Sequence, residues 1–177
     1  MRRSFVGGLL LAGMTVSTIG LAGTAMAADP PAPSEGAGTV TVVVDSSIQL
    51  SMTDSAISLQ GLAGATGVTA TDNQMAMNVK TNNITGYAVT VKADQADLLP
   101  GDTTANTDKI PVSNIRVTNN DDAAKAALSD TAAAPVASKD SRSIEAGDAI
   151  TATFDGDIPF VNSDTYTGTI TFTATAK

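Results

Sequence analysis

The sequence predicts an all-β fold: a single antiparallel, immunoglobulin-like β-sandwich. Three observations predict it. Apolar and polar side chains alternate with a period of two in several short runs. Clusters of Asn, Asp, Gly and Pro separate these runs at intervals that suit about eight strands. The 177 residues, once a leader is removed, are enough for one domain with a real core and too few for two comfortable ones.

The first 27 residues have the layout of a secretory signal peptide. Arg2 and Arg3 form a positive start, an apolar stretch follows, and Ala25-Met26-Ala27 is a small-x-small cleavage signal. A transmembrane anchor is the alternative, but the stretch is short, is interrupted by Gly and Thr, and lacks a basic flank. The two arginines also resemble a twin-arginine signal, so the export route stays open. We therefore expect a secreted protein with no membrane contact after cleavage.

A tether follows the leader. Residues 28–38 are rich in Pro, Gly and Ala and offer little that could be buried. From residue 39 the composition changes to β-branched and alternating runs. The predicted organisation is thus a signal peptide over 1–27, a tether over 28–38 and a β-sandwich domain over 39–177.

Within that domain the strand-like runs follow one rule, with apolar residues on one face and Thr or other polar residues on the other. Thr suits the wet face because its branched Cβ tolerates extended backbone while its hydroxyl meets water. The runs predicted as strands cover residues 39–45, 48–52, 75–79, 86–92, 115–117, 150–154 and 165–175.

Turn clusters divide the runs at 81–83, 99–102, 119–122 and 155–157. Residues 121–128 (DDAAKAAL) are an exception, because Asp121 or Asn120 could cap a short helix of about two turns. The Ala-, Pro- and Ser-rich stretch at 130–141 is predicted to be a loop.

Composition excludes several kinds of chemistry. The chain has no His and no Cys, which removes Ser-His-Asp and Cys-His nucleophiles, Cys/His zinc sites and disulfides. Without the leader, eight basic residues face 18 acidic ones, a net charge of −10, so binding to nucleic acid is not expected. The scarce aromatics cannot readily line a sugar cleft for paired carboxylates. We expect no enzymatic activity and no cofactor.

Clustered acids leave one metal alternative open. Asp155-Gly156-Asp157 and the pair Asp121 and Asp122 offer hard oxygen ligands of the kind that Ca²⁺ prefers. The Asp-x-Asp-x-Asp-Gly loop with its distal Glu is absent, and Asp is also a common turn residue. Calcium is therefore a weak alternative to a purely structural role for these acids.

Two strands resemble WxL-type cell-surface domains of Gram-positive bacteria. Residues 164–175 (DTYTGTITFTAT) resemble the family's closing strand, with Phe172-Thr173-Ala174 in place of its Trp-x-Leu motif. Residues 82–91 (NNITGYAVTV) match the layout of its earlier motif, with Tyr87-Ala88-Val89 at that position. The resemblance implies non-covalent attachment to peptidoglycan through Tyr87, Val89, Phe172 and Ala174. Both family tryptophans are replaced, and alternation alone favours core packing for Tyr87 and Phe172.

Two functions follow as expectations. The first is a bacterial, cell-wall-associated structural or attachment module whose partners are wall polymer or other surface proteins. The second is a self-assembling filament or pilus-like subunit, in which residues 39–45 add as a strand to a neighbour's open sheet edge.

Overall fold

The computed structural model describes residues 39–177, except for the side chains of residues 70–73. The predicted signal peptide (1–27) and tether (28–38) lie outside the described residues. Contacts divide the chain into one unit that ends at Val42 and a second, Val43–Lys177, which holds all the strands below. The second unit is an antiparallel all-β sandwich, as predicted; its immunoglobulin-like character stays a prediction.

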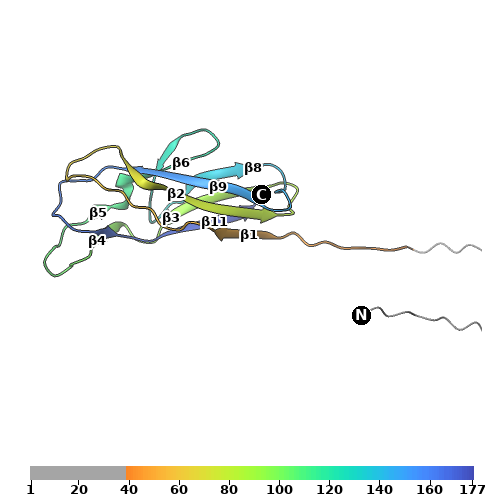
Figure 1. The fold of residues 1–177 in the computed structure, drawn as a ribbon. Coiled ribbons are helices and arrows are strands. Elements are labelled where there is room, and N and C mark those ends of the chain that lie inside the picture. The colour runs from red at the N-terminus through yellow and green to blue at the C-terminus, as the bar shows by residue number, and fades with distance from the viewer. Residues whose placement is uncertain (1–38) are drawn as a thin grey trace, which may run out of the picture. The chain divides into compact units, whose positions relative to one another are not determined.

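Five antiparallel strands form the first layer, in the order β1–β2–β9–β6–β7 (Figure 1). Their bounds are Ile48–Met52 (β1), Val68–Thr81 (β2), Asp148–Gly156 (β9), Ile115–Thr118 (β6) and Lys125–Ala127 (β7). The register between β2 and β9 places Met77 opposite Ile150, both of which are buried. Period-two alternation in these strands therefore produces the apolar inner face that the sequence predicts.

The second layer contains two three-stranded groups, β11–β3–β8 and β10–β4–β5. The bounds of the first group are Ile170–Ala176 (β11), Tyr87–Ala93 (β3) and Ala134–Lys139 (β8). Those of the second are Tyr166–Thr167 (β10), Asp97–Pro100 (β4) and Ile110–Pro111 (β5). One 3₁₀ turn, Val112–Asn114, leads from β5 into β6.

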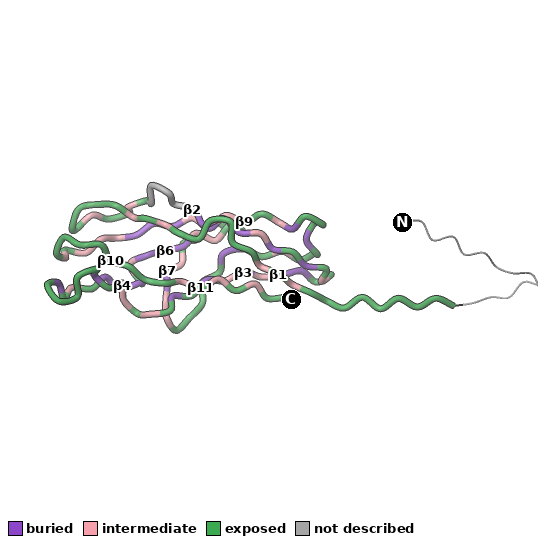
Figure 2. Tube along the Cα trace, turned by 60° about the horizontal axis from the view of Figure 1, so that its bottom comes forward, coloured by how far each residue is buried: buried purple, intermediate pink, exposed green. Residues whose placement is uncertain are grey.

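The core lies between the layers and is filled by inward-facing residues of both, seen as the buried stretches in Figure 2. Its largest fully buried side chains are Phe154, Met77, Val79, Val89, Val91, Val117 and Val136. Each such side chain contributes roughly 1.5–3 kcal/mol on burial. A chain without disulfides depends on this core for its stability.

The predicted helix at 121–128 is wrong. Residues 119–124 turn the chain from β6 into β7, and Val117 pairs with Ala126. Ala123 adopts a positive φ of 58°, and the Asp122 carboxylate accepts a hydrogen bond from the Ala124 amide at 2.9 Å. Pairing with β6 thus outweighs the helix propensity of the alanines, and the aspartate caps a turn.

The loop predicted at 130–141 is also wrong, because it contains β8. Val136 is completely buried, and the strand pairs with β3 along its length. The register shifts between Val89 and Thr90, the latter opposite Pro135. Proline has no N–H to donate, and this edge strand accommodates it at an irregularity in the pairing.

The predicted closing strand at 165–175 is split in two. β10 pairs with β4, whereas β11 pairs with β3. Gly168 lies at the break, where a Cβ atom would come within 2.5 Å of the Leu98 side chain. A larger residue at this position would have to displace the end of the Leu98 side chain. The single alternating run at 165–175 therefore contributes one strand to each of the two groups of the second layer.

The predicted strand at 39–45 joins none of the three sheets of the described chain, in which the first paired residue is Ile48. Its four valines are strongly exposed: Val40 by 89%, Val42 by 78%, Val43 by 81% and Val44 by 77%. The chain is fastened just after them, where Asn82 donates to the Asp45 carbonyl and accepts from the Ser47 amide, both at 2.8 Å. We call residues 39–45 the valine segment.

Candidate functional site

The four residues that the family resemblance assigns to wall binding lie on two paired strands. Tyr87 and Val89 are on β3, and Phe172 and Ala174 are on β11, with Val89 directly opposite Ala174. Tyr87 is 3% exposed and Val89 is 1% exposed, whereas Phe172 and Ala174 are half-buried. The structure therefore brings the four together and leaves only the β11 pair with access to solvent.

The Tyr87 hydroxyl ties the two layers together. It donates to Asp148 of β9 at 3.0 Å, and Lys139 of β8 approaches the same carboxylate oxygen at 2.9 Å. Burial, reinforced by this hydrogen bond and by the negative charge of Asp148, raises the pKa of Tyr87 to about 12. Burial also acts to raise the pKa of Asp148, but hydrogen bonds from Lys139, the Ile144 amide and Tyr87 outweigh it and lower that pKa.

The acids proposed for calcium fall in two places. Asp155 and Asp157 flank Gly156 at the end of β9 and are both held by Arg116 of β6, at 2.8 Å and 2.7 Å. Hydrogen bonds from Arg116 and from the Gly67 amide lower the pKa of Asp157 to about 2, and the two carboxylates raise the pKa of Arg116. Both carboxylates are therefore already paired with a cationic side chain of the protein.

The other oxygen of Asp155 is buried and accepts no well-directed hydrogen bond from the described residues, but Lys125 of β7 lies 3.0 Å from it as an ionic contact. Asp121 and Asp122 are exposed in the β6–β7 turn. Among the side chains that the structure describes, no group of three acids is arranged to hold a metal ion.

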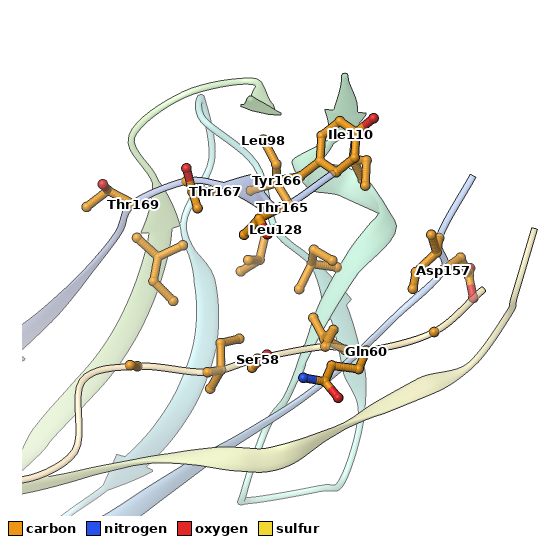
Figure 3. Close-up of a pocket in the computed structure, with 18 of the residues that line it drawn as sticks. Ser58, Gln60, Leu98, Ile110, Leu128, Asp157, Thr165, Tyr166, Thr167 and Thr169 are labelled. Atoms are coloured by element: carbon orange, nitrogen blue, oxygen red, sulfur yellow. The ribbon is translucent and has the colours of Figure 1, made fainter. Parts of the chain in front are cut away.

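A cavity of about 1030 Å³ opens between the two layers near β10 (Figure 3). We call it the lateral groove. One wall is formed by residues 55–63, which follow β1, and the other by residues 163–170. Its floor consists of apolar side chains from three strands and one loop: Leu98, Ile110, Ile115 and Leu128.

The walls of the groove have few backbone partners. β10 and β11 are both the last strands of their groups, so each has one edge without a strand partner in the described chain. On the opposite wall, residues 54–61 lie outside the strands apart from a single bridge at Ser58. The groove is therefore bordered by backbone that is able to pair with an added strand.

Polar contacts fix the rim beside β10. Asn106, which is 6% exposed, donates to the Asp164 carboxylate at 3.1 Å and to the Tyr166 hydroxyl at 3.0 Å. Tyr166 in turn donates to the Asn162 carbonyl at 2.9 Å. The hydrogen bond from Asn106, with others from the backbone, lowers the pKa of Asp164. Tyr166 is thereby held with its ring against the groove.

Sequence reasoning found the valine segment but missed the groove. The groove is assembled from segments more than a hundred residues apart, and none of them carries a motif. The signal that could have pointed to it is Leu62, an exposed leucine in a Gly- and Ala-rich stretch that predicts no strand.

The chain matches no protein-family model, and no curated protein matches it in sequence. Among the described residues, no helix has the length and apolar character needed to cross a bilayer.

Proposed function

We propose that this protein is a secreted structural module of the bacterial cell surface that assembles with further copies of itself by strand addition through the valine segment. The observation that carries the proposal is the exposure of the four valines of the valine segment. Each is at least 77% exposed, and they lie shortly before the first paired strand. Segments of this composition favour extended backbone and are stabilised when a neighbouring sheet edge pairs with them.

The energetics support association. Burying each valine contributes roughly 1.5–3 kcal/mol, and paired backbone adds hydrogen bonds. Ordering the segment and losing the freedom of a second molecule oppose this gain by several kcal/mol. Association therefore requires the buried valines and the paired backbone to act together.

The test is the size of the protein in solution. We expect the protein without residues 1–27 to form assemblies whose mass increases with concentration, as measured by light scattering after gel filtration. We expect residues 46–177, which retain every strand of the sandwich, to remain monomeric. Monomers in both cases would contradict the proposal, and assemblies of equal size in both would show that another surface drives them.

Attachment to the cell wall is the second candidate function. The observation in its favour is that Phe172 and Tyr166 both line the lateral groove, where an aromatic ring can contact a sugar. It also accords with the resemblance to WxL-type domains. Sedimentation with purified walls at several salt concentrations tests it: protein that stays entirely in the supernatant excludes it.

A further inference from the structure

We infer that the lateral groove receives the valine segment of a second copy of this chain. The inference rests on the proposed self-association and adds the place where the segment binds. It follows from the shape of the groove, the pattern of the segment, the route between them and the charges that each presents.

The groove has the character of a missing strand. Clefts that hold small molecules measure about 300–1,000 Å³, so an open groove of about 1030 Å³ has room for a larger occupant such as a strand. Its floor is apolar, with Ile110 and Leu128 only 7% and 3% exposed. Its borders are the outer edge of β10 and residues 55–61, which lie outside the strands apart from the bridge at Ser58. An added strand would meet apolar side chains below and backbone partners at the side.

The valine segment has the pattern that such a site requires. In an extended chain Val40, Val42 and Val44 point to one face, and Thr41 and Val43 point to the other. The face with three valines matches the apolar floor. At about 3.3 Å per residue the seven residues span roughly 23 Å, a length comparable to a typical strand.

A copy's own segment is badly placed to fill its own groove. The segment is fastened at Asp45 and Ser47 to Asn82, beyond the end of β2. The groove lies toward the other end of β1, where Leu50 and Met52 line it. A segment that reversed direction would first have to run beside β1, where β11 already lies. The segment of another molecule has no such restriction.

Charge does not oppose this occupant. The valine segment carries a single charge, on Asp45 at its end. The acids of the groove, Asp157 and Asp164, are engaged by Arg116 and Asn106 respectively. An uncharged apolar strand is therefore a better occupant for this strongly acidic protein than an acidic peptide.

Disulfide trapping tests the placement, since the chain has no cysteine of its own. Val42→Cys marks the donor, and Ser58→Cys, in a second protein that carries no other change, marks the groove. Ser113→Cys is the matched control, because it is also an exposed serine but does not line the groove. On mild oxidation of each mixture, we expect the Val42–Ser58 pair to give a heterodimer at least tenfold faster than the Val42–Ser113 pair.

Blocking variants give an independent measurement. We expect Ser58→Arg to weaken assembly at least tenfold and Ser113→Arg to leave it unchanged. We expect the double change V42D/V44D, on the valine face, to weaken assembly roughly 100-fold, and T41D/V43D, with the same charge on the other face, to weaken it much less. Circular dichroism and thermal melting of each variant confirm that the sandwich is intact.

The outcomes separate this inference from the proposed function. If assembly requires residues 39–45 but the two cysteine pairs cross-link equally, or Ser58→Arg assembles normally, the groove is not the receiving site and the proposed function stands. If the protein does not assemble at all, both fail. If Ser58→Arg assembles normally but no longer sediments with purified walls, the groove binds glycan and the inference is overturned.

Discussion

Tyr87 shows how one residue's surroundings decide between two interpretations of the same pattern. Its position in an alternating strand is compatible with a core residue or with an aromatic binding surface. Its 3% exposure and its hydrogen bond to Asp148 give it a structural task between β3 and β9. A ring in this position cannot touch a polymer unless the two layers separate.

This position predicts a stability change at high pH. The pKa of Tyr87 is about 12 in the folded protein, against an ordinary value of 10.0. Between these values the unfolded chain has lost a proton that the folded protein retains, so the free energy of unfolding falls as pH rises from 10 to 12. Below pH 10 this contribution is fully present.

Denaturant unfolding of the wild type and Tyr87→Phe at several pH values measures the effect. Every other titratable group is common to both proteins, so the comparison isolates Tyr87. We expect the variant to be about 1 kcal/mol less stable at pH 7, since it loses one hydrogen bond, and to lose less stability above pH 10. Parallel pH profiles would contradict the assignment.

Arg116 leads to a prediction about calcium. Asp155 and Asp157 are already bound by its guanidinium, so a calcium ion would have to displace an internal cation. We expect the melting temperature to be independent of Ca²⁺ concentration and of chelator. A rise that saturates with added Ca²⁺ would show preferential binding to the folded state and reinstate these acids as ligands.

At the scale of elements, alternation identified most of the central strands. Apart from Gly86, residues 75–79, 86–92, 115–117 and 150–154 all lie within strands. Each of these strands has one face in the core, which leaves a period of two in its sequence. Two of the errors, at 121–128 and 130–141, involve alanine-rich edge strands. Alanine favours helix by itself, and only pairing with β6 and β3 determines that these residues are extended.

β8 offers a direct test of this correction. If residues 134–139 are a buried strand, Val136→Ala removes methyl groups from a fully packed site, and we expect it to lower the free energy of unfolding by about 1–3 kcal/mol. Val43→Ala is the matched control, because Val43 is 81% exposed, and we expect a change within about 0.5 kcal/mol in the monomer. Chemical denaturation measures both, and an equally small effect at Val136 would return the segment to a loop.

The candidate site lies at the scale of the whole molecule, and there the sequence was least informative. The exposed valines are a local property that composition reveals. The lateral groove depends on how residues 55–63 and 163–170 approach each other across the sandwich, which no local pattern encodes. The valine segment could therefore be predicted from the sequence, whereas the lateral groove could be found only from the fold.

Net charge leads to a prediction at this scale. Every copy without residues 1–27 carries a net charge of −10, so copies repel one another, while the proposed contact itself is apolar. Added salt screens the repulsion and leaves the apolar contact in place. We expect self-association, measured by sedimentation, to be tighter at 0.5 M than at about 0.05 M sodium chloride. Weaker association at high salt would indicate that ion pairs hold the copies together.

The valine segment is attached beside Asn82, whereas the groove lies toward the Met52 end of β1, and this separation gives the molecule a direction. Each copy would give a strand forward and accept one behind, so a row of copies has two unlike tips and no built-in final length. A shortened copy that lacks residues 39–45 would still accept a neighbour but could not be followed by one. Mixed in small amounts with the intact protein, it would act as a terminator and set the length of the row by its proportion.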